Sequence, residues 1–179
     1  MKPSADHYPS DLLFDIETLI NVAQPQSILL LGDHSPVFLE PYLEQRQLLN
    51  QPCTLTVLES HEADALSQLQ TSFDVGIALD LFEHLDKAQG GRVLSRLRDV
   101  LTPQFCVALP LSGGGDKNNH PAWAINELFS FALTRVSVHT AGDRTIGLFK
   151  YHIADYKNTP DWLNPDNWAN PHMWGKYWW

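Results

Sequence analysis

The chain has few cysteines and no metal-binding signature. Cys53 and Cys106 are its two cysteines, and they lack the CxxC spacing of redox and zinc motifs. Both lie in strand-like runs, which favours two small buried thiols over a disulfide or a nucleophile. Its eight histidines form no HExxH or HxH pattern. The sequence therefore indicates neither redox chemistry nor a metal site.

Long apolar runs and an excess of basic residues are also missing. Runs such as residues 28–31 fall far short of the roughly 20 residues that a membrane span requires. The first ten residues, MKPSADHYPS, lack the apolar core of a signal peptide. Twelve Lys and Arg stand against 21 Asp and Glu, giving a formal net charge of −9, which disfavours nucleic-acid substrates. We expect a cytoplasmic protein that binds neither membrane nor nucleic acid.

One stretch, residues 73–85 (FDVGIALDLFEHL), organises the rest of the chain. The apolar run 75–79 stops at Asp80, and a helix-like segment follows with Glu83 and His84 near its start. This pattern is typical of a buried parallel strand that leads into a crossover helix. Ligands of open α/β sheets gather beyond the carboxyl ends of the strands, so these three polar residues lie where chemistry is expected.

Strand-like and helix-like segments alternate along the chain. Strands are expected at 27–31, 53–58, 75–79, 105–111, 135–139 and 145–152. Helices are expected at 12–20, 35–49, 60–69 and 121–133, and in the segment that begins near Glu83 and His84 and ends before 102–103. The last two strands are joined through 141–144, where Gly-Asp favours an antiparallel hairpin. Arg92, Arg96 and Arg98 fall largely off the apolar face of their helix and are expected in solvent. The alternation predicts an α/β fold with a doubly wound, mostly parallel sheet.

The stretch 73–85 also resembles a known motif. Its order of Phe-Asp, an apolar run, Asp, two apolar residues and Glu-His-Leu is similar to the fourth-strand region of class I S-adenosylmethionine-dependent methyltransferases, particularly small-molecule members. Residues 101–110 and 127–136 resemble the family's fifth-strand region and the stretch before its last strand. The similarity covers roughly residues 26–151 in the family's order. It implies a Rossmann-like sheet, S-adenosylmethionine as cofactor and a small-molecule substrate.

The chain departs from this family in two places. The family's first strand runs into a Gly-x-Gly-x-Gly loop, because glycines let the backbone approach the cofactor, whereas residues 32–36 read Gly-Asp-His-Ser-Pro. Only fourteen residues separate Glu59 from Asp74, enough for one helix and not for a helix, a strand and a second helix. We therefore expect the third strand, with its adenine contact, to be missing. The expected strand order is 2-1-4-5-7-6 by the family's labels.

The resemblance assigns cofactor contacts to Gly32, Asp33, Glu59 and Asp80. Glu59 matches the acidic residue after the second strand, whose two carboxylate oxygens accept from both ribose hydroxyls. Asp80 matches the end of the fourth strand, near the methionine amine. The alternatives are a solvated acid at a strand end for Glu59 and a helix N-cap for Asp80.

Two histidines are candidate catalytic residues. His84 is placed to take a proton from the hydroxyl or amine that attacks the methyl group, with Glu83 or Asp80 setting its tautomer. His120 follows the glycine-rich run 112–119, where some family members carry a histidine over the acceptor. The alternative for His84 is a histidine at a helix start that is hydrogen-bonded to backbone groups. The alternative for His120 is an ordinary loop histidine. We interpret the glycine-rich run as a lid over the crevice.

The composition changes abruptly after residue 157. Residues 158–179 repeat Trp-x-Asn-Pro at a six-residue interval and hold five of the six tryptophans. Because Asn-Pro favours turns, we expect a tail of turns that follows an α/β domain of residues 1–157. Exposing this many tryptophan side chains to water is unfavourable. The tail is expected to pack on its own domain, with a homodimer or protein-partner contact, or a wall of the ligand crevice, as alternatives.

Three functional hypotheses follow. The first is an S-adenosylmethionine-dependent methyltransferase that acts on a small molecule. The second is a non-catalytic methyltransferase-like binding or assembly module that has lost cofactor binding. The altered glycine loop favours the second hypothesis, and the acidic residues at 59 and 80 favour the first. A third hypothesis is an unrelated nucleotide-binding domain built on the same sheet.

Overall fold

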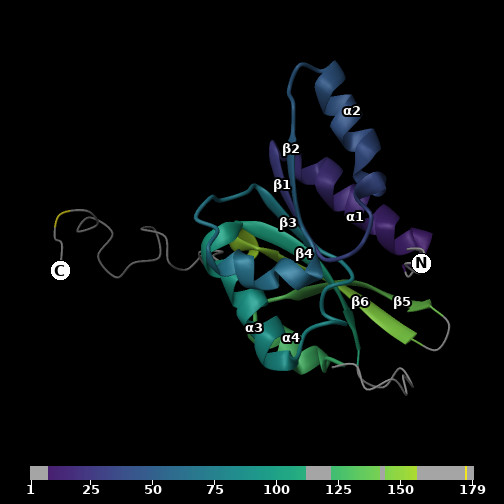
Figure 1. Cartoon of the computed structure of the whole chain (residues 1–179), viewed down its shortest axis with the longest axis vertical. Coiled ribbons are helices and arrows are strands. Elements are labelled where there is room, and N and C mark those ends of the chain that lie inside the picture. Colours follow the sequence, from purple (N-terminus) through teal and green to yellow (C-terminus); the bar gives the residue numbers. More distant parts are fainter. Residues whose placement is uncertain (1–7, 112–121, 142–143, 157–175, 177–179) are drawn as a thin grey trace.

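A mixed sheet forms the centre of the molecule. The computed structural model describes residues 8–111, 122–141, 144–156 and Lys176, and within these residues six strands have the order β2-β1-β3-β4-β6-β5 (Figure 1). The strands are β1 (Ser27–Leu31), β2 (Thr54–Leu58), β3 (Val75–Ala78), β4 (Gln104–Pro110), β5 (Thr134–Ala141) and β6 (Arg144–His152). The first four strands pair in parallel, and β6 lies antiparallel between β4 and β5. The predicted doubly wound sheet, its closing hairpin and its strand order are confirmed.

Helices cover both faces of this sheet (Figure 1). They are α1 (Ser10–Ala23), the 3₁₀ helix η1 (Pro36–Leu39), α2 (Glu40–Leu48), the 3₁₀ helix η2 (Ser60–Ser67), α3 (Lys87–Arg96), the π-helical turn η3 (Leu97–Leu101), α4 (Ile125–Ser130) and α5 (Ile153–Tyr156). The side chains of α1, η1 and α2 pack on one face, and those of η2, α3 and α4 pack on the other. In the described part of the chain, no helix has the length and apolar character needed to cross a bilayer.

Two apolar cores lie on the two faces of the sheet. Along β1, Leu29 and Leu31 join the core under α3, whereas Ile28 and Leu30 join the core under α1. Successive side chains of a strand point to opposite faces, and here both faces are covered. A strand buried on both sides needs apolar residues at every position, which explains the unbroken apolar run that β1 shows in the sequence.

The connection from β2 to β3 is short, as the sequence predicts. It contains η2 and no strand, and β3 pairs directly with β1 through Leu30 and Ile77. The expected absence of the family's third strand is therefore found in residues 59–74, all of which the structure describes. The N-cap of η2 is Glu59, not the predicted Ser60, and its backbone N–H donates to the Glu62 carboxylate at 3.1 Å.

The helix after β3 begins later than predicted. Asp86 is its N-cap: the Asp86 carboxylate accepts from the backbone N–H of Gln89 at 2.7 Å, and the Gln89 side chain accepts from that of Asp86 at 3.0 Å. This reciprocal pair is a capping box and fixes the first turn at Lys87. Glu83 and His84 consequently lie in the turn before α3, not at the start of a helix, and Asp80 is not an N-cap.

The expectation that all three arginines near α3 lie in solvent is also wrong for Arg96. Its guanidinium donates to the carbonyl oxygens of Leu69 at 2.7 Å and Ser67 at 3.2 Å. Arg96 thereby joins α3 to the segment at the end of η2. The predicted lid at 112–120, with His120, lies outside the described residues, as does the tail at 158–179 apart from Lys176.

Candidate functional site

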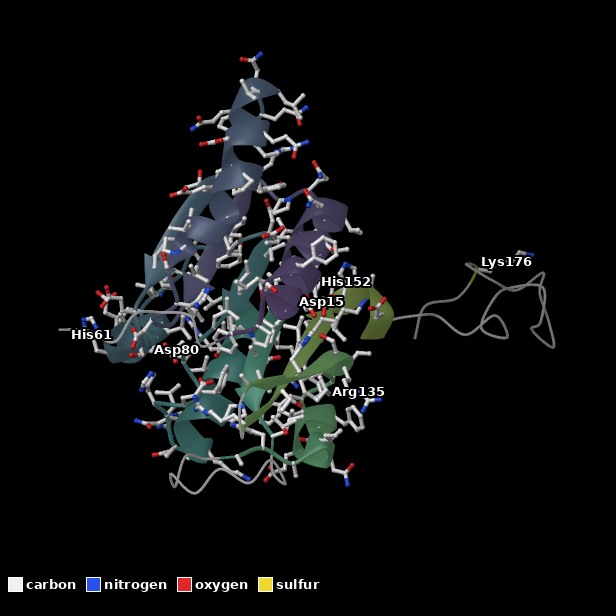
Figure 2. All side chains as sticks on the ribbon, turned by 90° about the vertical axis from the view of Figure 1, so that its right-hand side faces the viewer. Asp15, His61, Asp80, Arg135, His152 and Lys176 are labelled. Atoms are coloured by element: carbon white, nitrogen blue, oxygen red, sulfur yellow. The ribbon has the colours of Figure 1, made fainter. Side chains whose placement is uncertain are left out.

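Four of the predicted site residues meet at one edge of the sheet. Gly32 and Asp33 follow β1, Glu59 follows β2 and Asp80 follows β3. From β1 the chain crosses to β2 on one side, and from β2 it returns past β1 to β3 on the other. This is a topological switch point, where a crevice opens beyond the carboxyl ends of the strands. In Figure 2, Asp80 lies on the same side of the molecule as His61, a residue of η2, the helix that follows β2.

Gly32 allows the ends of β1 and β3 to approach closely. Its φ is +108°, and a Cβ atom built on it would lie 1.9 Å from the carbonyl oxygen of Leu79. The Gly32 N–H donates to the carbonyl of Leu58 at 2.9 Å, so the same residue also ties β1 to β2. The backbone geometry alone requires glycine here.

Asp33 connects the loops that follow β1 and β2. Its carboxylate accepts from the backbone N–H of Ser60 at 2.9 Å and from the Ser60 hydroxyl at 2.5 Å. The Asp33 N–H donates to the carbonyl of Asp80 at 3.3 Å. One residue therefore touches all three loops of the site, and its negative charge is held at the first turn of η2.

His84 lies between two carboxylates. Its Nε2 atom is 3.7 Å from Oδ2 of Asp33 and 3.5 Å from Oδ1 of Asp80. All three side chains are partly exposed, so the imidazole is reachable from solvent. The structure thus brings the predicted base and two of the predicted cofactor contacts into one cluster.

Glu59 stands at the rim of this cluster. Its carboxylate lies 3.3 Å from Nδ1 of His61, and half of its side-chain surface is exposed. The oxygens remain open to hydroxyl donors from solvent or a ligand. This exposure is compatible with both interpretations of Glu59, a ribose contact and a solvated acid.

Sequence reasoning missed a buried pair beneath the cluster, Tyr8 and Glu83. The Tyr8 hydroxyl donates to the Glu83 carboxyl at 3.0 Å and accepts from the backbone N–H of Asp80 at 2.7 Å. Burial raises the pKa of Glu83, against the hydrogen bonds that its carboxyl accepts, including the one from Tyr8, and burial also raises the pKa of Tyr8 well above its ordinary value. Tyr8 lies before the amphipathic pattern that predicts α1, so the periodicity of that helix does not indicate the contact with Glu83.

His34 replaces the second glycine of the family's loop with a buried ring. It is 8% exposed and packs edge-on against Tyr8, with ring centroids 5.5 Å apart, and against Phe38 at 5.6 Å. These contacts are those of a core side chain. The loop after β1 is therefore held by aromatic packing at the position where the family uses a residue without a side chain.

A second group of polar residues resembles a hydrolase triad in composition only. Nε2 of His139 lies 2.8 Å from the Ser137 hydroxyl and 3.2 Å from the Asp15 carboxylate, and Ser137 donates to Asp15 at 2.6 Å. A catalytic triad uses one ring nitrogen for serine and the other for the carboxylate. Here one nitrogen serves both partners, so the group links α1 to β5. In the described ranges, no three His, Cys, Asp or Glu residues are arranged to hold a metal ion.

Two solved structures that share this fold are methyltransferases. One is magnesium protoporphyrin IX methyltransferase from Synechocystis PCC 6803 with bound S-adenosylhomocysteine, which is 10% identical over 78% of this chain and 81% of its own, with a TM-score of 0.53. Another is an O-methyltransferase from Bacillus cereus in complex with S-adenosylhomocysteine, 12% identical over 83% of this chain and 82% of its own, with a TM-score of 0.50. At such identities the likeness establishes the methyltransferase-like fold alone.

The sequence comparisons give a family without an activity. A search of the curated proteins found no match. One family model matches residues 10–179, a range that contains both the candidate site and the tryptophan-rich segment. The chain belongs to that family, which is described as a family of unknown function, DUF6231.

Proposed function

We propose that this protein binds S-adenosylmethionine beyond the ends of β1, β2 and β3 and transfers its methyl group to a small molecule. The observation that carries the proposal is the meeting of Asp33, Asp80 and His84 at the switch point of a methyltransferase-like sheet. The fold is shared with a protoporphyrin methyltransferase and an O-methyltransferase, each in complex with S-adenosylhomocysteine.

The acidic residues fit two parts of the cofactor. The sulfonium and the amine of S-adenosylmethionine are positively charged, and nearby carboxylates such as Asp33 and Asp80 stabilise positive charge. Glu59 offers half-exposed carboxylate oxygens as acceptors for the two ribose hydroxyls. The positive sulfonium is absent from S-adenosylhomocysteine, so this acidic site is expected to prefer the methyl donor over the product.

His84 supplies the acid–base chemistry in this proposal. S-adenosylmethionine, when bound, presents a methyl group on a sulfur that keeps the electron pair of the broken bond. The Nε2 atom of His84 accepts the proton that leaves the hydroxyl or amine of the acceptor. Asp33 and Asp80, at 3.7 and 3.5 Å, then stabilise the imidazolium that forms.

Calorimetric titration of the purified chain with S-adenosylmethionine and S-adenosylhomocysteine tests the proposal. We expect micromolar binding, a loss of at least roughly tenfold in Glu59→Gln, because a carboxylate is replaced by a weaker acceptor (about 1.4 kcal/mol or more), and no change in Glu44→Gln. Glu44 is an exposed residue of α2 and serves as the matched control. A folded wild-type protein that gives no heat up to millimolar ligand would rule the proposal out.

A second candidate function is a non-catalytic binding or assembly module. Two observations favour it: the buried ring of His34 in the loop after β1, and the single short connection η2 in place of the family's third strand. Such a module would fold and bind a partner without binding the methyl donor. The same titration separates the two candidates, since only the methyltransferase requires the ligand to bind.

A further inference from the structure

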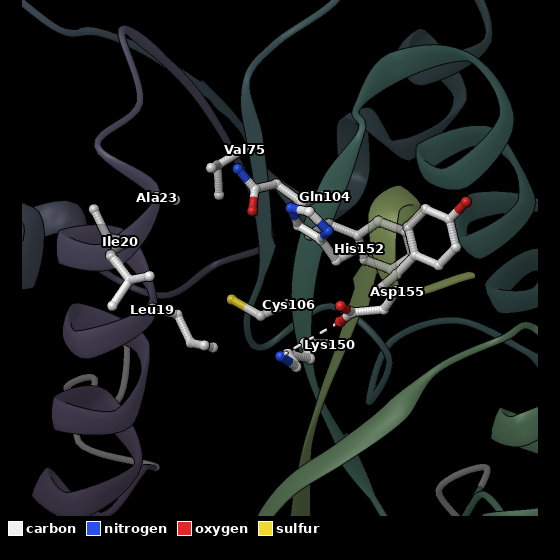
Figure 3. A pocket seen from close by; sticks show the side chains of 12 residues that line it. Leu19, Ile20, Ala23, Val75, Gln104, Cys106, Lys150, His152 and Asp155 are labelled. Atoms are coloured by element: carbon white, nitrogen blue, oxygen red, sulfur yellow. Dashed lines mark ion pairs between the residues drawn. The ribbon is translucent and has the colours of Figure 1, made fainter. Parts of the chain in front are cut away.

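A pocket of about 420 Å³ lies at the edge of the sheet where β3 and β4 begin. It separates the last turns of α1 from β4 and β6 (Figure 3). The candidate site lies beyond the opposite ends of the parallel strands. In Figure 2, His152, which lines the pocket, is on the other side of the molecule from Asp80 and His61. The pocket is therefore a separate feature.

The lining of the pocket combines an apolar wall with an ionic rim. The apolar side chains come from α1, β3 and β4, and they are Leu19, Ile20, Val22, Ala23, Val75 and Cys106. At the rim, the ammonium of Lys150 lies 3.6 Å from the Asp155 carboxylate, as the dashed line in Figure 3 marks. This arrangement suits a flat apolar group that carries one hydrogen-bond donor.

An indole has these properties. Its body is apolar, its N–H seeks an acceptor such as a carboxylate, and its face attracts an ammonium group such as that of Lys150. The volume of the pocket is in the range of sites that hold small aromatic ligands. Val22 of α1, which is 80% exposed, stands at the pocket without cover from the described residues.

The sequence carries tryptophans shortly after Asp155, a residue that lines this pocket. Asp155 lies in α5, four residues long, and the chain continues from there into segment 157–179, which holds five of the six tryptophans. Trp162 is seven residues beyond Asp155, a separation that spans at most about 25 Å. Trp168 and Trp174 are further along and would close longer loops at a greater entropic cost. The family match continues through this segment, which makes it part of the unit that defines the family.

We propose that the indole of Trp162 docks in the pocket between α1, β4 and β6 of its own chain. Asp155, two residues before this segment, lies at the rim, so the indole is presented at a high effective concentration. For short linkers this is in the millimolar range, which favours the same chain over a second copy. The occupied pocket fastens the tryptophan-rich segment to the sheet edge opposite the candidate site. This inference does not depend on the proposed methyl transfer.

A double-mutant cycle in the full-length chain tests the docking. Val22→Glu places a charge beside the pocket at a side chain that is 80% exposed, so the folded domain itself tolerates the change. Trp162→Ala removes the proposed occupant. We expect each single variant to lower the Tm by roughly 3 °C, and the double variant to lower it no further than one of them, because both remove the same contact.

Two matched variants act as controls. Leu48→Glu introduces the same charge at a residue of α2 that is 83% exposed, and Trp178→Ala removes a tryptophan from the far end of the segment. Both are expected to leave the Tm unchanged. Additive shifts in the double variant, or unchanged Tm values in both single variants, would overturn the proposal. A coupling that appears only in a dimer, seen by light scattering over a range of concentrations, would assign the pocket to a second copy and also overturn it.

Discussion

The hydroxyl of Tyr8 donates to the buried carboxyl of Glu83, 75 residues further along the chain, over 3.0 Å. The same oxygen accepts from the backbone N–H of Asp80 at 2.7 Å. Tyr8, two residues before the start of α1, is thereby fixed to the turn that follows β3. The position of Asp80, and through it of His84, depends on a contact from the other end of the domain.

Tyr8→Phe is expected to loosen the candidate site. It leaves the N–H of Asp80 without its acceptor, and losing a buried hydrogen bond costs about 1–2 kcal/mol. Tyr42→Phe is the matched control, because the Tyr42 hydroxyl donates to the carbonyl of Pro25 at 2.8 Å, away from the site. Urea denaturation should show a similar loss of stability in both variants. Only Tyr8→Phe should weaken S-adenosylmethionine binding, and equal binding by the two variants would contradict a role of Tyr8 in shaping the site.

The buried carboxyl of Glu83 is expected to make the free energy of unfolding depend on pH. Burial raises the pKa of its carboxyl in the folded state above the unfolded value, so the folded state holds the proton more tightly. This contribution to stability is present in full below the unfolded pKa, and it is lost as the pH rises through the folded pKa. Glu83→Gln cannot ionise and should therefore lose less stability than the wild type as the pH rises above the ordinary glutamate pKa of about 4.3. Parallel pH profiles of the free energy of unfolding would show this expectation to be wrong.

Two glycines should respond in opposite ways to the same substitution. Gly32→Ala places a methyl group 1.9 Å from the carbonyl oxygen of Leu79 at a φ of +108°, and we expect a loss of about 3 kcal/mol or more. Gly91 lies within α3, and a Cβ there would meet only the ring of Phe131, at 3.5 Å. Gly91→Ala should leave the protein as stable or raise its stability by up to about 1 kcal/mol. Urea midpoints of the two variants measure the difference.

The two thiols should differ in reactivity. Burial raises the pKa of Cys106 to about 12, which keeps the thiol protonated at neutral pH and inert. The thiol of Cys53 is half-buried, so a disulfide reagent at pH 8 should modify one cysteine in the native protein and two after unfolding. Cys53→Ser should abolish the native reaction. A fast native reaction in that variant would mean that β4 opens readily.

The sheet could be predicted because its signals are local. The continuous apolar runs of β1 and β3 reflect burial on both faces, and the Gly-Asp pair at 142–143 stands between the two strands of the hairpin. The missing third strand follows from chain length, since residues 60–73 are too few for it. Once the strands are parallel and adjacent, the residues after them share one edge, which is why Asp33 and Asp80 could be expected together.

The contacts that could not be predicted join distant segments. Tyr8 with Glu83, and Arg96 with the carbonyl of Leu69, depend on the packed structure and leave no periodic trace in the sequence. The start of α3 is different, because Asp86 and Gln89 have the spacing of a capping box. This spacing marks the start of α3 in the sequence. The predicted helix began too early, near Glu83 and His84. The core position of His34 also needs the aromatic neighbours that only the fold supplies.

The short connection between β2 and β3 also determines how the sheet ends. With no further strand beside it among the described residues, β2 is an edge strand, and its outward backbone groups form a template on which another chain could pair. The strand is only five residues long and includes Thr54 and Thr56. Short, partly polar edges limit such pairing. The short connection therefore leaves β2 as an edge strand with few backbone groups on which another chain could pair, and substitutions that make its exposed positions more apolar are expected to favour pairing between chains.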